Sequence, residues 1–520
     1  MSNLPLKILA LRCRAFVFTL VISGIANLPA SANGWEHWGI PLNLLLDTLE
    51  GDDPGYRMRA ARSLGFRREL LALPRLLQML RDKDERPRVR IEVAQALGRI
   101  GHQKAIPELV YVLRQDSREE IRGAAATALS RIASDTAVEP LISALETERN
   151  LLVQNDIVSA LGVFKNPKAV ATLAELMMST TNRSLYRRAI IALGRSLSPL
   201  AAEPLLKALA LSRTDGERAA IVTALGRIAN PKARPHLEQL FDTTETAMLK
   251  VQIAAALGAI RDGSAVPKLI ELLDDDLAAV RFFAVDALAE SKDTSAIVPL
   301  QNLYHRATAA SGSLDELFNH QAVANFLAEQ SLRVAVIRAL TVLDPKGSIG
   351  EFLDAAVPSD RPRNSALGLR LNEGIFELRR AALVGLGYSR TKAAKKFLTG
   401  SGVLLDRDFR LRATAARALG VIRDPASASL VAHLLKDVKA EVRWVAVKVL
   451  GRLGNVSAAE KIHQLLVDPH PEVRRQAVHS LGYLGYTNSC PDLAQILNRD
   501  EAKPVREAAE MAVSHLCTQN

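Results

Sequence analysis

Aromatic residues and cysteine are scarce in this 520-residue chain. Phe, Trp and Tyr make up 4% of the sequence, whereas hydrophobic residues as a whole make up 48%, so a core has to be built from Ala, Leu, Val and Ile. The three cysteines include no Cys-x-x-Cys pair, which argues against the common zinc and thiol-redox motifs. We therefore expect an aliphatic core and no metal site.

Motifs of catalysis are missing as well. The sequence has no Gly-rich phosphate loop, no Gly-x-Ser-x-Gly and no Asp-rich calcium loop, and none of its ten histidines is followed by Glu. These absences predict no catalytic residue and no cofactor. The net charge of +11 points instead to an acidic partner.

One apolar stretch is long enough to suggest targeting. Three basic residues precede AFVFTLVISGIANLPA, and the small residues at 30–32 follow it. The stretch is shorter than the roughly 20 residues of a membrane span. It predicts a signal peptide at 1–32 that is cleaved after Ala32, and thus export to the periplasm or beyond the cell. No other stretch predicts a transmembrane segment.

A repeat organises the remaining chain, residues 33–520. The phrase VRIEVAQALGRIG at 89–101 recurs as VRWVAVKVLGRLG at 442–454 and as VRRQAVHSLGYLG at 473–485. Aligned on the glycine, most repeats are 31 to 33 residues apart, and Leu precedes the aligned residue in 13 of 14 repeats. The aligned positions, called the register residues below, are Gly65, Gly98, Ser130, Gly162, Gly194, Gly226, Gly258, Ala289, Thr341, Gly387, Gly420, Gly451, Gly482 and Ser514.

Each repeat reads as two helices. The first is short, as at 105–113 and 265–273, with Pro107 or Pro267 in its first turn. The second is the repeated phrase, whose apolar residues are spaced for one helix face. Turn dipeptides at 166–167, 230–231, 262–263 and 424–425 separate the repeats. Because one hairpin cannot bury both of its apolar faces, we predict an all-α right-handed solenoid of about 14 helical hairpins. Small register residues would let neighbouring helices approach, at a cost to helix stability of about 1 kcal/mol for each Gly.

The arrangement resembles HEAT repeats, in the short variety found in phycobilisome-lyase-like proteins, over nearly all of 41–517. In HEAT repeats a similar ladder of Asp and Arg runs along the stack. Here a basic residue stands eight positions before most register residues and an Asp stands six positions earlier in seven repeats, so we predict a structural ladder. Its members are Arg90, Arg122, Arg281, Arg412, Arg443, Arg474, Asp84, Asp116, Asp275, Asp437 and Asp468.

One face of the second helix carries an excess of positive charge. The positions seven before, three before and one after each register residue share a face, and in HEAT-like solenoids the second helices line the concave side. We call these 42 positions the basic stripe, because 12 of them are basic and three, Asp286, Glu290 and Glu507, are acidic. Its basic members are Arg62, Arg99, Arg131, Arg187, Arg195, Arg227, Arg338, Arg380, Arg417, Lys448, Arg452 and Arg475.

Aromatic residues join this face toward the C-terminus. Tyr388, Trp444 and Tyr483 are stripe residues, as is His479, and Arg and aromatic side chains are enriched at binding hot spots. These residues and the basic members predict a partner-binding groove. A solvated helix face with an accidental basic bias is the alternative.

Two insertions, at about 305–331 and 358–375, interrupt the even spacing. The first contains a Ser-x-x-Glu helix start at 313–316, and we expect the inserted helix to cover a less polar part of the stripe around Val251 and Phe282. The second has the composition of a loop. Either insertion can be a seam between two halves of the solenoid or a partner contact.

Cys490 and Cys517 are candidates for a disulfide. Cys490 precedes the last first helix and Cys517 ends the last second helix, and these points meet at one end of an antiparallel hairpin. Export to an oxidising compartment would allow the bond.

The sequence therefore favours an exported, non-catalytic scaffold whose groove takes an acidic protein segment or an anionic polymer of the cell envelope. Nucleic acid suits the charge, but the signal peptide argues against it. The alternative is an enzyme like the phycobilisome lyases or deoxyhypusine hydroxylase. The resemblance implies cytoplasmic substrates for the lyases and His-Glu iron ligands for the hydroxylase, and this chain has no such pairs.

Overall fold

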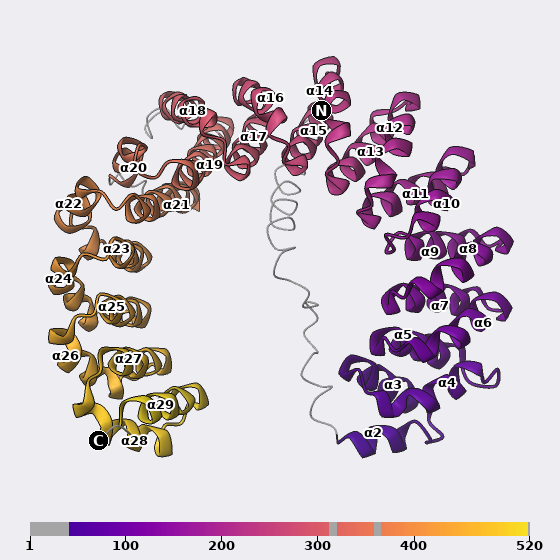
Figure 1. Ribbon diagram of the computed structural model, residues 1–520, viewed down its shortest axis with the longest axis horizontal. Coiled ribbons are helices and arrows are strands. Elements are labelled where there is room, and N and C mark those ends of the chain that lie inside the picture. The colour runs from indigo at the N-terminus through magenta and orange to yellow at the C-terminus, as the bar shows by residue number, and fades with distance from the viewer. Residues whose placement is uncertain (1–40, 311–319, 358–365, 518–520) are drawn as a thin grey trace. The chain divides into compact units, whose positions relative to one another are not determined.

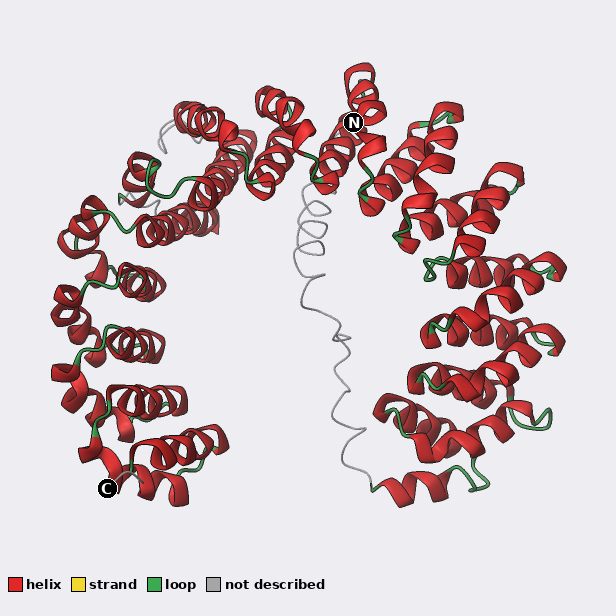
Figure 2. Cartoon of the chain, in the orientation of Figure 1, coloured by secondary structure: helices red, strands yellow, loops and turns green. Residues whose placement is uncertain are grey.

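The computed structural model describes residues 41–310, 320–357 and 366–517. The predicted signal peptide and the Ser-x-x-Glu helix start lie outside these residues. Within them the chain consists of helices and connecting loops, without a strand (Figure 2). The prediction of an all-α solenoid is confirmed.

Fourteen second helices carry or adjoin the register residues. They are α3 (Pro54–Arg67), α5 (Pro87–Ile100), α7 (Glu119–Ile132), α9 (Leu151–Leu161), α11 (Arg183–Ser196), α13 (Asp215–Ile228), α15 (Ala247–Ile260), α17 (Ala278–Ser291), α19 (His320–Leu343), α21 (Ala366–Ser389), α23 (Phe409–Ile422), α25 (Ala440–Arg452), α27 (Pro471–Leu484) and α29 (Lys503–Leu516).

A first helix precedes each of them in the described residues. The first helices are α2 (Leu42–Thr48), α4 (Leu73–Arg81), α6 (Ile106–Gln115), α8 (Val138–Thr147), α10 (Pro167–Ser179), α12 (Ala202–Leu211), α14 (Arg234–Thr243), α16 (Val266–Glu271), α18 (Ile297–Ala310), α20 (Ile349–Ala356), α22 (Lys392–Gly400), α24 (Ala428–His433), α26 (Ala459–His463) and α28 (Cys490–Arg499).

The predicted turn dipeptides begin helices. The Asn166 side chain accepts the N–H of Lys168 at the start of α10, and Pro167 occupies the first helical position. Asn230, Asp262 and Asp424 accept in the same way at short 3-10 turns that lead into the first helices α14, α16 and α24. Side-chain acceptors thus satisfy amide groups that have no partner within the helix.

The chain forms two compact units. The described part of the first is 41–204, and that of the second is 205–310, 320–357 and 366–517. In the first unit α3, α5 and α7 pack in sequence, as do α23, α25 and α27 in the second, while the first helices form a separate layer (Figure 1). The core lies between the layers. All 13 leucines that precede a register residue are fully buried, so the repeated Leu is the central core residue of these 13 hairpins.

The register residues stand where neighbouring second helices meet. A Cβ atom added to Gly98 would lie 2.8 Å from the Cα atom of Ala128 on α7, and one added to Gly387 would lie 2.9 Å from the Cα atom of Ala418 on α23. These distances are shorter than the contact distance of two carbon atoms that are not bonded to each other. The prediction that the small residue permits close approach is confirmed.

The two insertions lengthen helices. The first extends both α18 and α19, and α19 runs for 24 residues without a break. The prediction of a loop over 358–375 is wrong for 366–375, which form the first part of α21. A Cβ atom on Gly374 would lie 3.5 Å from Leu327 Cδ2 on α19. The two extensions therefore pack together, and this tertiary contact supplies stability that the local composition lacks.

The last hairpin is covalently closed. Cys490 begins α28 and Cys517 follows the last turn of α29, and a disulfide joins them, with their Cα atoms 5.8 Å apart. Among the described residues this hairpin packs against one other hairpin, and the bond reinforces it.

We predict that Gly98→Ala lowers the free energy of unfolding. Alanine favours an isolated helix, but the added methyl overlaps α7, and overpacking of this kind costs about 1 to 3 kcal/mol. Gly216→Ala is the matched control, because the start of α13 has no atom within 4 Å of the added methyl. Urea unfolding followed by circular dichroism should show a lower midpoint for Gly98→Ala alone. Equal midpoints for wild type and Gly98→Ala would refute the packing role.

We also predict that breaking the disulfide loosens the C-terminal hairpin. A loop of 27 residues predicts a loss of about 3.5 kcal/mol in the chain-entropy account. Amide hydrogen exchange, compared before and after reduction, should show faster exchange in α28 and α29, with α23 unchanged. A Cys517→Ser variant should exchange like the reduced wild type; slow exchange in both would contradict the prediction.

Candidate functional site

The second helices bring the basic stripe to the surface. Of its 12 basic residues, eight are exposed and four, Arg99, Arg380, Lys448 and Arg475, are half-buried. All 12 therefore reach solvent. They differ in whether a carboxylate neutralises them.

In the first unit, two arginines of the basic stripe bind the carboxylate of Glu92 on α5. Arg62 donates to Glu92 Oε2 and Arg99 donates to Glu92 Oε1, each over 2.8 Å. Glu92 is 6% exposed, and although burial raises its pKa, the two arginine hydrogen bonds lower it overall. Arg99 also stacks on the ring of Phe66, 4.5 Å from its centroid. The sequence prediction missed Glu92 because it lies six positions before the register residue.

Arg131, Arg187 and Arg195 are exposed and have no ion-pair partner among the described residues. Burial and the charge of Arg99 lower the pKa of the Arg131 guanidinium. Asp156 on α9 is the next carboxylate along this face, and burial raises its pKa while Arg188 lowers it. The stripe of the first unit thus keeps an excess of unpaired positive charge.

In the second unit most stripe arginines are paired. Arg380 and Arg338 share Glu377, Arg417 contacts Glu441 over 3.3 Å, and Arg475 contacts Glu472. Glu377, Glu441 and Glu472 all stand ten positions before a register residue, one helical turn beyond the positions counted in the sequence. Extending the count by one turn would have found them.

The aromatic residues form an exposed group in the second unit. Trp444 is half-buried, and two cations lie over its ring: Arg417 Cζ is 5.3 Å and Lys448 Nζ is 5.9 Å from the centroid. Tyr388 is 55% exposed and Tyr483 is 75% exposed. Burial, reinforced by the charge of Arg475, lowers the pKa of His479. Cationic and aromatic surfaces therefore alternate along α21, α23, α25 and α27.

Arg227 and Arg452 lie in the last turns of α13 and α25, and neither has an ion-pair partner in the part of the chain that the structure describes. A helix C-terminus attracts cations, so this position also has a structural explanation. Arg99, Arg131 and Arg195 also lie in the last turns of their helices, so the attraction to the helix C-terminus applies to them as well.

The middle of the stripe is less polar. Val251, Ala255 and Phe282 are half-buried, and Val334 is buried. Phe282 meets Phe283 edge to face, and both rings are half-covered. Asp286 retains contact with solvent, yet its carboxyl group is partly desolvated by its neighbours. This desolvation and the charge of Glu290 raise the pKa of Asp286. The helix start that was expected to cover this patch lies outside the described residues.

The Arg column forms a chain of contacts between turns. Arg443 donates from Nε and Nη2 to the Asp468 carboxylate over 2.7 and 2.8 Å, and from Nη1 to the Asp437 carbonyl over 2.8 Å. Arg412 and Arg474 repeat this pattern with Asp437 and Asp500. Each arginine therefore ties its own turn to the next one.

The first unit and the junction before α19 vary the pattern. Arg90 reaches Asp116 over 2.6 Å and donates to the Leu80 carbonyl. Arg122 pairs with Glu148. Arg281 pairs with Glu329 on the extended α19.

The predicted ladder is wrong at Asp84, and at Asp275 the main-chain carbonyl takes part, accepting from Arg281 Nη1 over 2.8 Å, while the carboxylate does not pair with an arginine. Arg57 pairs with Glu85 in place of Asp84, because the loop before α5 is longer than that before α7 and brings the next carboxylate into reach. The Asp275 carboxylate accepts the N–H of Leu277. In the preceding repeat the basic residue that could pair with it is Lys250, whose ammonium group lies over the ring of Phe241. A lysine cannot supply the forked donors of arginine.

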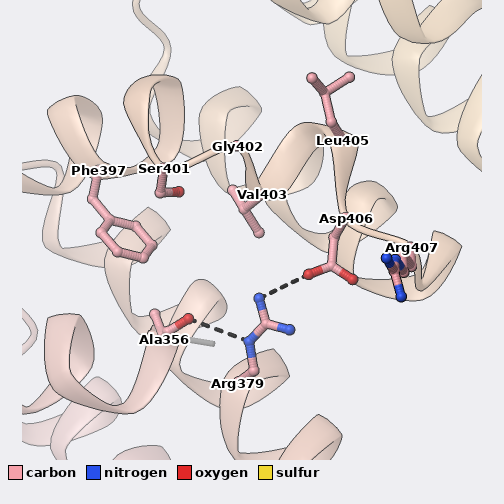
Figure 3. Close-up of a pocket in the computed structure, with 9 residues that line it drawn as sticks. All are labelled: Ala356, Arg379, Phe397, Ser401, Gly402, Val403, Leu405, Asp406 and Arg407. Atoms are coloured by element: carbon pink, nitrogen blue, oxygen red, sulfur yellow. Dashed lines mark hydrogen bonds and ion pairs between the residues drawn. The ribbon is translucent and has the colours of Figure 1, made fainter. Parts of the chain in front are cut away.

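A cavity of about 320 Å³ surrounds one ladder pair (Figure 3). Arg379 donates to Asp406 over 2.9 Å and to the Ala356 carbonyl over 3.3 Å. Phe397 and Ser401 line the opposite wall. The described lining residues include no member of the basic stripe, so the cavity is separate from it.

Comparison with known proteins gives the family. The model of HEAT repeats matches residues 42–130, 106–185, 138–221, 176–254, 244–311, 364–443 and 427–514. The chain is a HEAT-repeat protein. The comparison with curated proteins gave no match.

Solved structures similar to this HEAT-repeat protein are importin-β solenoids. Yeast importin-β (Kap95p) is 14% identical, with 91% of this chain and 72% of that chain covered and a TM-score of 0.56. The Kap95:Nup1 complex is 14% identical, with 93% and 73% covered and a TM-score of 0.56. Importin-β in an ammonium sulfate condition is 12% identical, with 92% and 74% covered and a TM-score of 0.57. At these identities the likeness concerns the fold.

Two further features of the HEAT-repeat protein concern its described residues alone. No helix in them is both long and apolar enough to span a bilayer. No group of three or more His, Cys, Asp or Glu side chains in them is arranged to hold a metal ion.

We predict that Asp468→Asn destabilises the protein by about 1 to 3 kcal/mol at neutral pH, because Arg443 loses a charged acceptor. Burial opposes ionisation of Asp468, but the hydrogen bonds from Arg443 and from the His470 N–H lower its pKa overall. A lowered pKa stabilises the fold above the unfolded value of about 3.9, and this stability is lost as the pH falls through the folded pKa.

Unfolding midpoints between pH 7 and pH 3 test this. The gap between wild type and Asp468→Asn should be constant above about pH 5 and should narrow below about pH 4. Asp84→Asn is the control, since Asp84 is exposed and outside the ladder. A gap that does not depend on pH would show that ionisation of Asp468 contributes nothing.

Proposed function

We propose that this HEAT-repeat protein is an exported, non-catalytic scaffold that binds an acidic protein segment along its basic stripe. The observation that carries the proposal is the alternation of cationic and aromatic side chains on α21 to α27. Trp444 contacts both Arg417 and Lys448 through its ring, and Tyr388 and Tyr483 stand exposed on the same face. Large exposed aromatic residues beside arginine are typical of binding hot spots.

The carboxylates on this face favour a protein over a uniform polyanion. Glu377, Glu441 and Glu472 stand between the stripe arginines. They would repel an evenly charged polymer, whereas a segment with acidic and apolar residues can avoid them and cover the aromatic rings. An incoming carboxylate can also exchange with a surface ion pair at small cost, because such pairs contribute about 0 to 1 kcal/mol.

The similar structures support a scaffold role by their fold. One of them is a complex of Kap95 with Nup1, so a solenoid of this kind binds a protein partner there. Stacked hairpins present an extended surface that repeat proteins use for binding. This suits a partner that binds in an extended conformation.

Export rests on the N-terminal sequence. The basic, apolar and small-residue order at 1–32 supports a signal peptide, and the partner would then be a protein of the cell envelope. The repeat spacing of mostly 31 to 33 residues supports the short, phycobilisome-lyase-like repeat variety. The disulfide at 490–517 agrees with an oxidising compartment.

Binding of a defined acidic peptide tests the proposal. The probe is a fluorescent peptide that alternates Glu with Leu and Phe, and the variant replaces Arg417, Lys448 and Arg452 by Glu. We expect at least tenfold weaker binding by fluorescence anisotropy, with a strong dependence on salt for the wild type.

The control replaces Lys396, Lys436 and Lys461 by Glu. These exposed lysines lie in the first-helix layer of the same region, so both variants change the net charge equally. The control should bind like the wild type. Equal weakening in both variants would reduce the effect to net charge, and tighter binding of polyphosphate than of the peptide would favour a polymer as partner.

A further inference from the structure

The stripe of the first unit contains three arginines around one carboxylate. Arg62 on α3 and Arg99 on α5 bind the two separate oxygens of Glu92, which is almost fully buried. Arg131 follows on α7, which packs directly against α5 where Gly98 meets Ala128. Three positive charges and one negative charge leave this cluster with a net charge of +2.

Arg99 is held in place before any ligand arrives. Its Nη1 donates to Glu92, its Nη2 donates to Gln95 Oε1 over 3.1 Å, and its Cζ lies over the ring of Phe66, 4.5 Å from the centroid. A guanidinium fixed on three sides loses little conformational freedom on binding. It therefore offers its remaining N–H groups in a set direction.

Arg131 is the uncompensated member. It has no ion-pair partner among the described residues, and it follows the register residue of α7 as Arg99 follows that of α5, on two helices that pack together. The next carboxylate along the stripe, Asp156, is influenced by Arg188 instead. The surface around Arg99 and Arg131 thus holds two cations, of which Arg99 is paired with Glu92 and Arg131 has no ion-pair partner among the described residues.

We propose that Arg62, Arg99 and Arg131 form a binding site for a phosphate group. The proposal rests on the proposed function in one respect, namely that the acidic partner carries the phosphate. A phosphate monoester carries nearly two negative charges near neutral pH and matches the net charge of the cluster. Planar guanidinium groups bind its oxygens in pairs. A single carboxylate would neutralise half of this charge.

Isothermal titration of the full chain with inorganic phosphate, in a chloride buffer of low ionic strength, tests the site without any partner. We expect saturable binding with one phosphate per chain. Arg131→Gln should weaken it at least tenfold. Arg99→Lys should weaken it too, because it keeps the charge but removes the planar fork.

The matched control is Arg195→Gln. Arg195 occupies the same register position in α11, is exposed and has no ion-pair partner among the described residues, so it removes the same charge from the same unit. It should bind phosphate like the wild type. Absence of saturable binding in the wild type, or equal weakening by Arg131→Gln and Arg195→Gln, would overturn the proposal.

Two further titrations identify the source of the phosphate. A phosphoserine peptide should bind more tightly than its unphosphorylated counterpart, and Arg131→Gln should abolish the difference. Tighter binding to phosphatidic acid vesicles than to the phosphopeptide would overturn the partner as carrier. Because the acidic-peptide experiment depends on α23 and α25, its failure would leave phosphate binding unchanged, and each hypothesis can fail alone.

Discussion

Close contact between neighbouring second helices is the constraint on which the rest of the solenoid depends. At Gly98 and Gly387 the backbone of one helix lies against an alanine of the next, with no room for a methyl group. This contact fixes the distance between hairpins and brings the residues that flank the glycine into register from one repeat to the next. The basic stripe and the ladder are both consequences of that register, because each lies at a fixed offset from the contact.

The regular spacing of these contacts explains which features of the structure could be predicted from the sequence. A repeated Leu-Gly at even spacing predicted the hairpins, the buried leucines and the close approach, since each depends on contacts that recur in nearly every repeat. Asp468 and Asp116 could be placed beside an arginine for the same reason. Features that obey a repeat are visible in one sequence because the chain itself supplies the alignment.

Departures from the repeat were not visible. Glu85 replaces Asp84 because a loop is longer, and no local pattern shows which carboxylate an arginine will reach. The start of α21 has the composition of a loop, and its helix depends on α19, a partner distant in the sequence. Glu92 and Glu377 were not predicted as part of the charged face, because charges were counted only at fixed positions from the register residue. Long side chains also pair across one helical turn and between helices.

The covalently closed hairpin at the C-terminus affects how this protein resists degradation. In a linear array the end units have fewer neighbours, so they open first and offer unfolded backbone to proteases. The bond between Cys490 and Cys517 limits how far α28 and α29 can separate when they open. Under the proposed export, such a closure would keep a hairpin that opens locally from offering a long stretch of its backbone to proteases.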